Sequence, residues 1–187
     1  TIQGEGFHAG RAAYFIRLAG CDVGCHWCDV KESWDASLHP VLDMEKLAQT
    51  AAKHCKTIII TGGEPLMWNL EFLTQKLKGL GCTIHIETSG SHPLSGHLDW
   101  ITLSPKKVKQ PLPEVYKKAN ELKMVIFNNH DFKFAEEQAA KVSENCLLYL
   151  QSEWSKRETN YPKITNYILE NPQWRSSVQT HKYLDIR

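Results

Sequence analysis

The sequence Gly20-Cys21-Asp22-Val23-Gly24-Cys25-His26-Trp27-Cys28-Asp29 places three cysteines within eight residues, in a Cys-x3-Cys-x2-Cys spacing. Thiolates at this spacing converge on one small volume, and they are the usual ligands of a [4Fe–4S] cluster. Such a cluster takes four ligands, and no fourth cysteine lies nearby. Gly20 and Gly24 allow the backbone to wrap closely around a bulky group. We therefore predict that Cys21, Cys25 and Cys28 hold a cluster in which one iron keeps an open position.

An open iron can be chelated by the amino and carboxylate groups of S-adenosylmethionine, and an electron from the cluster then cleaves the C–S bond to give a 5′-deoxyadenosyl radical. The alternative is a zinc site with His26 or Asp29 as the fourth ligand. Structural zinc ligands usually come as two separated pairs, so the single loop favours the cluster. The other three cysteines are scattered singly and are predicted to be buried thiols: Cys55, Cys82 and Cys146.

Short β-branched and aromatic runs alternate with helical patterns along the whole chain. The expected strands cover residues 13–19, 57–61, 83–87, 100–104, 121–127 and 145–151, and the expected helices cover 43–55, 68–80, 113–120, 131–142 and 162–170. Asp131 is expected to cap the fourth helix and Pro162 to lie in the first turn of the fifth. A run at 176–180 is a possible seventh strand.

Parallel strands joined by right-handed helical crossovers can close fully or partly into a barrel. We therefore expect one α/β domain over residues 1–187, folded as an incomplete βα barrel of about six parallel strands. A flat doubly wound sheet is the alternative fold.

Charge and hydropathy exclude several classes of partner. The 22 basic residues nearly balance the 21 acidic residues, so the chain has no excess positive field for nucleic acid. No apolar run approaches the roughly 18 residues that span a bilayer, and the N-terminus has no secretory pattern. We expect a soluble, cytoplasmic protein without a nucleic-acid or membrane partner. Because the chain begins at Thr1 without a methionine, upstream residues are expected to be missing.

Two charged residues on expected strands are candidates for substrate binding. Arg17 lies inside an apolar strand, where a guanidinium needs an anion. A substrate carboxylate held in bidentate geometry is one partner, and an internal salt bridge with Glu5 or Glu87 is the alternative. Glu87 ends the third strand on a polar face shared with Thr83 and His85, so its carboxylate can accept hydrogen bonds from two adjacent N–H donors of a ligand. Its alternative role is to cap the following turn.

The cysteine spacing resembles the radical S-adenosylmethionine superfamily, and further motifs resemble its 7-carboxy-7-deazaguanine synthase family, of the queuosine pathway. These motifs are Gln3-Gly4-Glu5-Gly6, Phe15-Ile16-Arg17-Leu18, Cys28-Asp29, Thr61-Gly62-Gly63-Glu64-Pro65, Glu87-Thr88-Ser89-Gly90, Ser104-Pro105-Lys106 and Gln179-Thr180-His181-Lys182. The resemblance implies conversion of 6-carboxy-5,6,7,8-tetrahydropterin to 7-carboxy-7-deazaguanine with loss of ammonia. It also implies a homodimer and a flavodoxin-like or other electron donor.

The resemblance further implies the roles of individual residues. No side chain is expected to act as an acid or base, since the radical comes from the cofactor. His181 is expected either to pack or to close the pocket. The implied substrate contacts are Ile2, Gln3, Gly4, Arg17, Thr61 and Glu87, and the implied S-adenosylmethionine contacts are Gly63, Glu64, Ser104, Pro105, Lys106 and Gln151.

One position departs from the family pattern. The family commonly has a threonine after Cys-Asp, whose hydroxyl binds Mg2+, and this chain has Val30. Magnesium is a hard cation that requires oxygen ligands, and valine has none. Asp29, a backbone carbonyl or water is then expected to substitute, or the protein uses its metal differently.

Two other functions remain open from the sequence. One is a glycyl-radical-activating enzyme, whose substrate is a protein. The Gln3-Gly4-Glu5-Gly6 motif and Glu87 argue against it, because a protein substrate needs no acceptor for a pterin edge. The other is a zinc module without catalysis.

Overall fold

The computed structural model describes residues 1–186, which form one curved sheet of seven strands with helices on its outer face. The strands pair in chain order and all pairs are parallel, as predicted. They are β1 (Tyr14–Leu18), β2 (Thr57–Gly62), β3 (Thr83–Thr88), β4 (Trp100–Leu103), β5 (Glu121–Ile126), β6 (Leu147–Ser152) and β7 (Trp174–Ser177). Within the described residues β7 does not pair with β1, so the barrel is incomplete.

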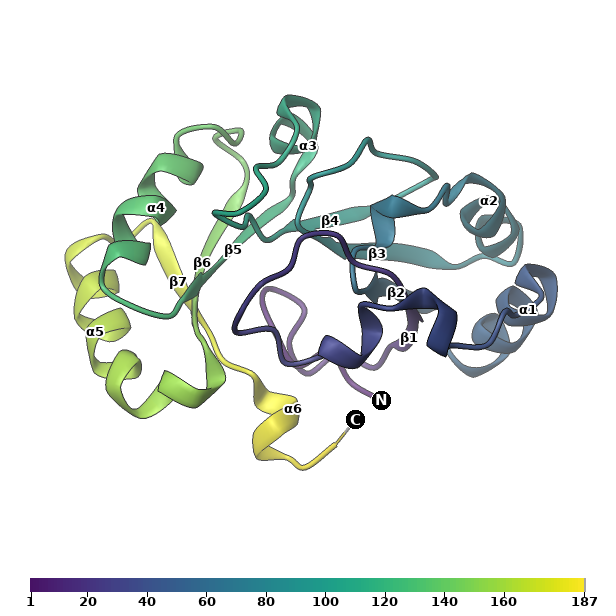
Figure 1. Cartoon of the computed structure of the whole chain (residues 1–187), viewed down its shortest axis with the longest axis horizontal. Coiled ribbons are helices and arrows are strands. Elements are labelled where there is room, and N and C mark those ends of the chain that lie inside the picture. Colours follow the sequence, from purple (N-terminus) through teal and green to yellow (C-terminus); the bar gives the residue numbers. More distant parts are fainter. Residues whose placement is uncertain (187) are drawn as a thin grey trace.

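Apart from the short helix near the C-terminus, the helices lie around the convex side of the sheet, and the cysteine loop lies on the concave side (Figure 1). Four short 3-10 turns also occur in the loops, at Lys31–Ser33, Ala36–Leu38, Pro65–Met67 and Trp154–Lys156. The helices are α1 (Met44–His54), α2 (Glu71–Gly79), α3 (Pro113–Lys118), α4 (His130–Ala139), α5 (Arg157–Glu170) and the short α6 (Thr180–Tyr183). None of the helices described is long and apolar enough to cross a membrane.

Alternation along the strands separates the core from the concave face. Successive side chains of a strand point to opposite faces of the sheet. One set packs against the helices in the main core, and it includes Ile58, Ile60, Ile84, Ile86, Leu122, Met124 and Ile126. The other set contains Arg17, Glu87 and Lys123, which line the cavity inside the barrel. The predicted polar inner face is therefore present.

Three sequence predictions need correction. The possible seventh strand is present in the described sheet, but it covers Trp174–Ser177 instead of 176–180. Helix α5 begins at Arg157, five residues before the predicted start, so Pro162 lies inside the helix. The early start has a tertiary cause, because the buried Asn160 side chain donates to the Ile126 carbonyl at 2.9 Å. The carbonyl that Pro162 leaves without a donor belongs to Glu158, which is exposed.

The third correction concerns Asp131, which does not cap α4. Asn129 occupies the N-cap position, and Asp131 lies in the first turn of the helix. Its carboxylate accepts hydrogen bonds from the backbone N–H groups of Phe127 and Asn128, at 2.8 and 2.7 Å. It also pairs with Lys107. Asp131 therefore stabilises the turn that leads from β5 into α4.

The scattered cysteines are free thiols, and Cys82 and Cys146 are buried as predicted, while Cys55 is half-buried. Burial raises the pKa of Cys146 to about 12, so this thiol stays protonated at neutral pH. These residues are suited to packing and not to metal binding.

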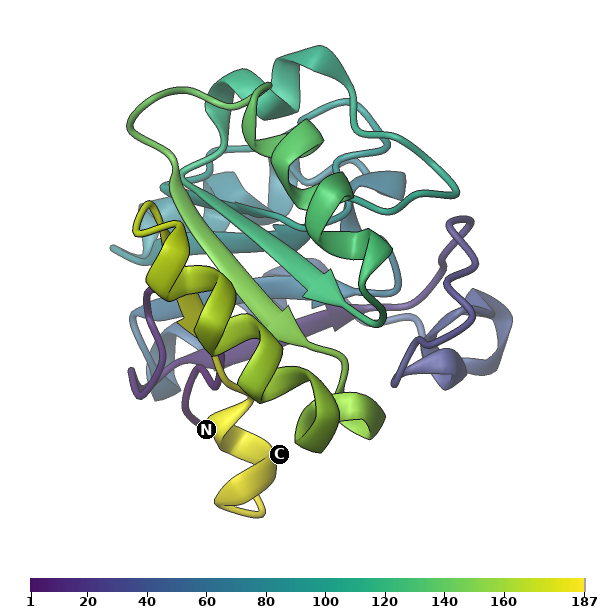
Figure 2. The same ribbon diagram turned by 90° about the vertical axis from the view of Figure 1, so that its left-hand side faces the viewer.

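The opening between β7 and β1 is covered by residues from both ends of the chain. Residues 1–13 form a loop that is closed by an antiparallel bridge between Ile2 and Ala12. The Gly4 carbonyl accepts from the backbone N–H and the hydroxyl of Thr180, at 2.9 and 3.0 Å. The N-terminal loop and α6 accordingly lie on the same side of the molecule in both views (Figures 1 and 2).

Two glycines with nearly equal backbone angles allow a test of packing after β3. Gly90 and Gly81 have φ values of 75° and 74°. A Cβ at Gly90 would lie 2.5 Å from Leu103 Cδ1, whereas a Cβ at Gly81 would meet nothing within 4 Å. Both alanine variants carry the left-handed strain of about 1–2 kcal/mol, but only Gly90→Ala also overpacks the core, by about 1–3 kcal/mol more. Urea unfolding should show that Gly90→Ala is the less stable variant. Equal losses would contradict the packing.

Candidate functional site

A cavity of about 1120 Å³ lies inside the open barrel, at the carboxyl ends of the strands. This is the end where βα barrels place their active sites. Of the candidate site residues, Pro105 alone does not line this cavity; it is buried beside it. The cavity is lined by Ile2, Gln3, Gly4, Arg17, Cys21, Cys25, Cys28, Thr61, Gly63, Glu64, Glu87, Ser104, Lys106 and Gln151.

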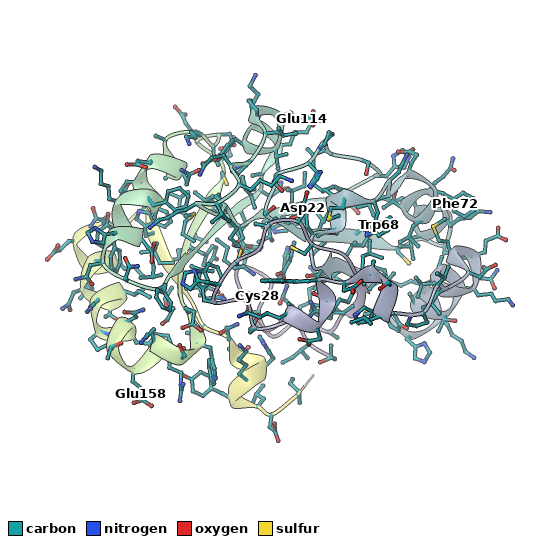
Figure 3. All side chains as sticks on the ribbon, viewed as in Figure 1. Asp22, Cys28, Trp68, Phe72, Glu114 and Glu158 are labelled. Carbon is teal, nitrogen blue, oxygen red and sulfur yellow. The ribbon has the colours of Figure 1, made fainter. Side chains whose placement is uncertain are left out.

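The cysteine loop is held over the cavity by backbone hydrogen bonds. Gly20 and Cys21 donate to the carbonyls of Ser33 and Trp34 at 2.7 and 3.1 Å, and Cys28 donates to the Cys25 carbonyl at 3.0 Å. Figure 3 shows Cys28 near the middle of the molecule. Three thiols thus reach one cavity from one loop, as a cluster with one thiolate on each of three irons requires.

The Gly-Gly-Glu-Pro segment after β2 packs directly against the cysteine loop. The Glu64 N–H donates to the Gly20 carbonyl at 2.8 Å. A side chain at Gly63 would collide with that carbonyl and with Cys21 Cβ. Only glycine allows this close approach, which leaves the Gly63 backbone at the cavity surface beside the cysteines.

The Glu64 carboxylate is buried and already satisfied. It accepts hydrogen bonds from the Leu66 N–H at 3.0 Å, from the Thr88 hydroxyl, and from the N–H and hydroxyl of Ser89 at 2.8 and 2.6 Å. The side chain therefore joins the loops after β2 and β3, and it is the backbone of Glu64 that remains for a ligand.

The segment after β4 brings the ammonium of Lys106 near the thiols. Lys106 Nζ donates to the carbonyl and hydroxyl oxygens of Ser104, at 2.8 and 2.6 Å, and lies 5.3 Å from the Trp27 ring. Burial lowers the pKa of Lys106, and the nearby Cys25 opposes this effect. Burial likewise raises the pKa of the Cys25 thiol. Lys106 therefore lies beside the cysteine loop, at the cavity surface.

Arg17 projects from β1 into the open cavity. Its Nη1 donates to the Gly62 carbonyl at 3.1 Å. No carboxylate of residues 1–186 forms a salt bridge with it, and the alternative partners Glu5 and Glu87 both pair with Lys123. The guanidinium is exposed in the cavity and remains available to an anionic ligand.

A buried ion network forms the floor of the cavity, and its centre, Lys123, was missed from the sequence. Lys123 Nζ pairs with Glu5 and with Glu87, the latter at 3.0 Å. Gln3 Nε2 donates to the other oxygen of Glu87 at 2.6 Å. Glu87 therefore binds across the cavity and does not cap a turn. The available signal was a lysine within the apolar strand Glu121–Ile126, the same signal that identified Arg17.

Lys123 determines the charge state of Glu5. Burial acts to raise the pKa of Glu5, but attraction to Lys123 and hydrogen bonds from Lys123 and Gln179 lower it to about 2. The two carboxylates in turn raise the pKa of Lys123 against the effect of its own burial. Lys123 and Glu5 are thus charged at neutral pH, and the ion pairs hold Lys123, Glu5 and Glu87 in place.

The remaining predicted residues lie on the C-terminal side of the cavity. Gln151 on β6 is buried, and its carbonyl oxygen accepts from the Ser177 hydroxyl at 2.6 Å. His181 packs its ring against Gly4, where any side chain would collide with it. His181 also lines the cavity, so it both packs and closes the pocket.

The residues after Cys28 do not suit a magnesium ion. Val30 offers no oxygen, and the Asp29 carboxylate accepts from Lys182 Nζ at 2.6 Å. Among the described residues no group of three His, Cys, Asp or Glu side chains is arranged to hold a single metal ion. A hard divalent cation needs several oxygen ligands, and of the side chains that closely follow Cys28 only Asp29, which is paired with Lys182, and Glu32 bring a carboxylate to the cavity.

Comparison with known proteins agrees with this geometry. The Radical SAM superfamily model matches residues 15–127. A 7-carboxy-7-deazaguanine synthase from Flavobacterium psychrophilum is 60% identical, with 100% of this chain and 89% of the relative aligned. One from Synechocystis is 50% identical, with 100% and 90% aligned.

A solved structure shows the same likeness in three dimensions. The crystal structure of QueE from Escherichia coli superposes with a TM-score of 0.84 at 30% identity, covering 97% of this chain and 91% of that one. With three cysteines at one cavity, a family model over most of the barrel and relatives aligned nearly end to end, the chain belongs to the 7-carboxy-7-deazaguanine synthase family of radical S-adenosylmethionine enzymes.

Proposed function

We propose that this chain converts 6-carboxy-5,6,7,8-tetrahydropterin to 7-carboxy-7-deazaguanine with loss of ammonia, as an enzyme of queuosine biosynthesis. The observation that carries the proposal is a single cavity with the three cysteines above and, below them, an available guanidinium and a carboxylate aimed inward. A carboxypterin offers the matching groups, namely an anion and an edge of N–H donors.

Cys21, Cys25 and Cys28 would hold the [4Fe–4S] cluster, which with S-adenosylmethionine supplies the radical that abstracts a substrate hydrogen. The Gly63 and Glu64 backbones, Ser104 and Lys106 lie around the cysteine loop and are proposed to position S-adenosylmethionine. The buried Pro105 is proposed to shape the segment that carries Ser104 and Lys106, and Gln151 contributes from β6. The contribution of the protein is to position the reactants and to exclude water.

The substrate is proposed to lie between Arg17 and Glu87. Arg17 binds the carboxylate, and Glu87 accepts from the aminopyrimidine edge with lone pairs that Gln3 and Lys123 leave open. Thr61 pairs with Arg17 in the sheet and adds a hydroxyl beside the guanidinium. Ile2, Gln3 and Gly4 contribute from the N-terminal loop.

The wider assignment follows from the family. We propose that residues 1–187 form a single radical S-adenosylmethionine domain that works as a cytoplasmic homodimer and receives electrons from a flavodoxin-like or other donor.

Mg2+ is left out of the reaction scheme, because Val30 and the engaged Asp29 do not form a site for it. A protein-activating enzyme or a zinc module is not favoured, since the relatives, which align over 89% and 90% of their own length, are named as synthases.

Metal analysis and a product assay test the function directly. Anaerobic reconstitution should give about four irons per chain and negligible zinc. Cys25→Ala should lose most of the iron, whereas the half-buried Cys55→Ala should retain it. Incubation with reductant, S-adenosylmethionine and the carboxypterin should yield 7-carboxy-7-deazaguanine by mass spectrometry. A cluster that forms but makes no such product would overturn the assignment of substrate.

Arg17→Ala tests the carboxylate partner. A charge-assisted bidentate pair contributes about 1.5–3 kcal/mol, so kcat/KM for the pterin should fall roughly 10- to 100-fold. Iron content and slow S-adenosylmethionine cleavage without substrate should persist. Arg17→Lys should fall between, because it keeps the charge and loses the fork. Arg11→Ala, outside the cavity, is the control. Unchanged pterin turnover in Arg17→Ala would refute the assignment.

Lys123→Met tests the buried network. Loss of one partner from a buried ion pair costs about 3–5 kcal/mol, so the free energy of unfolding at pH 7 should fall by that order, and Glu5→Gln in the same chain should recover part of it. Lys123 lowers the pKa of Glu5 from 4.5 to about 2, so this stabilisation is present above pH 4.5 and is lost as the pH falls toward 2. Urea unfolding at several pH values measures both effects. Equal stability of Lys123→Met at pH 7 would contradict the network.

A further inference from the structure

An ion pair joins the cysteine loop to the C-terminal helix at the side of the cavity. Asp29 directly follows the last cysteine, and its Oδ2 accepts from Lys182 Nζ of α6 at 2.6 Å. Asp29 and Lys182 both line the cavity, and the Lys182 side chain is only 20% exposed. The ammonium also lies 5.2 Å from the Trp154 ring, which forms the adjoining wall. A positive charge is therefore held where the cavity meets the cysteine loop.

The position of Lys182 depends on the floor of the cavity. Thr180 at the start of α6 donates twice to the Gly4 carbonyl, and Gln179 Nε2 donates to Glu5 at 2.8 Å. The Lys182 N–H itself donates to the Gln179 carbonyl at 3.0 Å. The helix that carries the ammonium is thus anchored to the loop that supplies the proposed substrate contacts.

The other two lysines that line the cavity each have two acceptors. Lys106 donates to Ser104, and Lys123 lies between two carboxylates. Lys182 Nζ has one acceptor among the described residues, Asp29, so two of its three N–H bonds are left for a ligand. An anionic oxygen that approached Asp29 without an intervening cation would be repelled.

We propose that the Lys182 ammonium, held by Asp29, takes the place of a divalent cation in this chain and binds an anionic oxygen of the substrate. The proposal rests on the proposed function. Lys182 belongs to a motif shared with the family, so the feature particular to this chain is Val30, which removes an oxygen ligand at the point where a metal would need one. The direct contact of Asp29 with Lys182 leaves a cation of the protein itself at that point. An ammonium donor satisfies the same oxygen without a metal coordination shell.

The chain supplies a matched control. Lys109 pairs with Asp22, another aspartate of the cysteine loop, but neither residue lines the cavity. Reconstituted wild type, Lys182→Met, Lys109→Met and the double variant Val30→Thr with Lys182→Ala should be compared under anaerobic conditions, each with EDTA and with added Mg2+. Mn2+, used as the probe for a magnesium site, should be titrated into each protein with S-adenosylmethionine and followed by electron paramagnetic resonance.

The proposal predicts a different kcat/KM and Mn2+ binding for the individual variants. Wild-type kcat/KM for the pterin changes less than about twofold between EDTA and Mg2+, and the wild type binds no Mn2+ at micromolar concentrations. Lys182→Met loses about tenfold or more in kcat/KM, as for loss of a charge-assisted hydrogen bond, with unchanged iron content, while Lys109→Met matches the wild type. The double variant binds Mn2+ and regains turnover with Mg2+.

Two results would overturn the inference: tight Mn2+ binding or EDTA-sensitive turnover in the wild type, or unchanged pterin kinetics in Lys182→Met. Failure of the proposed function would give a different result from these two, because the wild type itself would then make no 7-carboxy-7-deazaguanine. The Mn2+ titration needs no turnover, so it decides the metal question in that case as well.

Discussion

The buried ammonium of Lys123 is the interaction on which the cavity depends. A binding surface inside a barrel must bring carboxylates out of water, and such groups are costly unless they are paired. Lys123 pairs with Glu5 from the N-terminal loop and with Glu87 from β3 at once. Through Glu5 it also supports Gln179 and hence α6. One side chain thus links the sheet, both ends of the chain and the proposed substrate site.

A second constraint is steric and acts at the opposite side of the cavity. The cysteine loop can lie close to the sheet only because Gly63 has no side chain, and the Glu64 carboxylate then joins the loops after β2 and β3. The ligands of a cluster and the backbone that would face S-adenosylmethionine are therefore positioned by the same contact. Packing and binding are not separate functions of this segment.

The sequence predicted the fold with small errors, and each error has a tertiary cause. Local patterns could not show that Asn160 would anchor the start of α5 on the end of β5, so Pro162 was placed at the helix start instead of inside it. Aspartate is typical of helix N-caps, but the Asp131 carboxylate accepts hydrogen bonds from the turn before the helix. The partner that each of these side chains takes depends on which backbone N–H and C=O groups the folded chain brings near it.

The spacing of Cys21, Cys25 and Cys28 and the βα alternation were determined by the sequence alone, because ligand spacing and strand or helix period are local properties. Arg17 and Glu87 could also be identified, since a charge in an apolar strand is visible without a structure. Only the tertiary structure decided that Arg17 forms no salt bridge with a carboxylate of residues 1–186. It also decided that Glu87 pairs with Lys123 and that Lys182 reaches Asp29. Those pairs join residues 36 and 153 positions apart, and their distances follow from how the barrel closes.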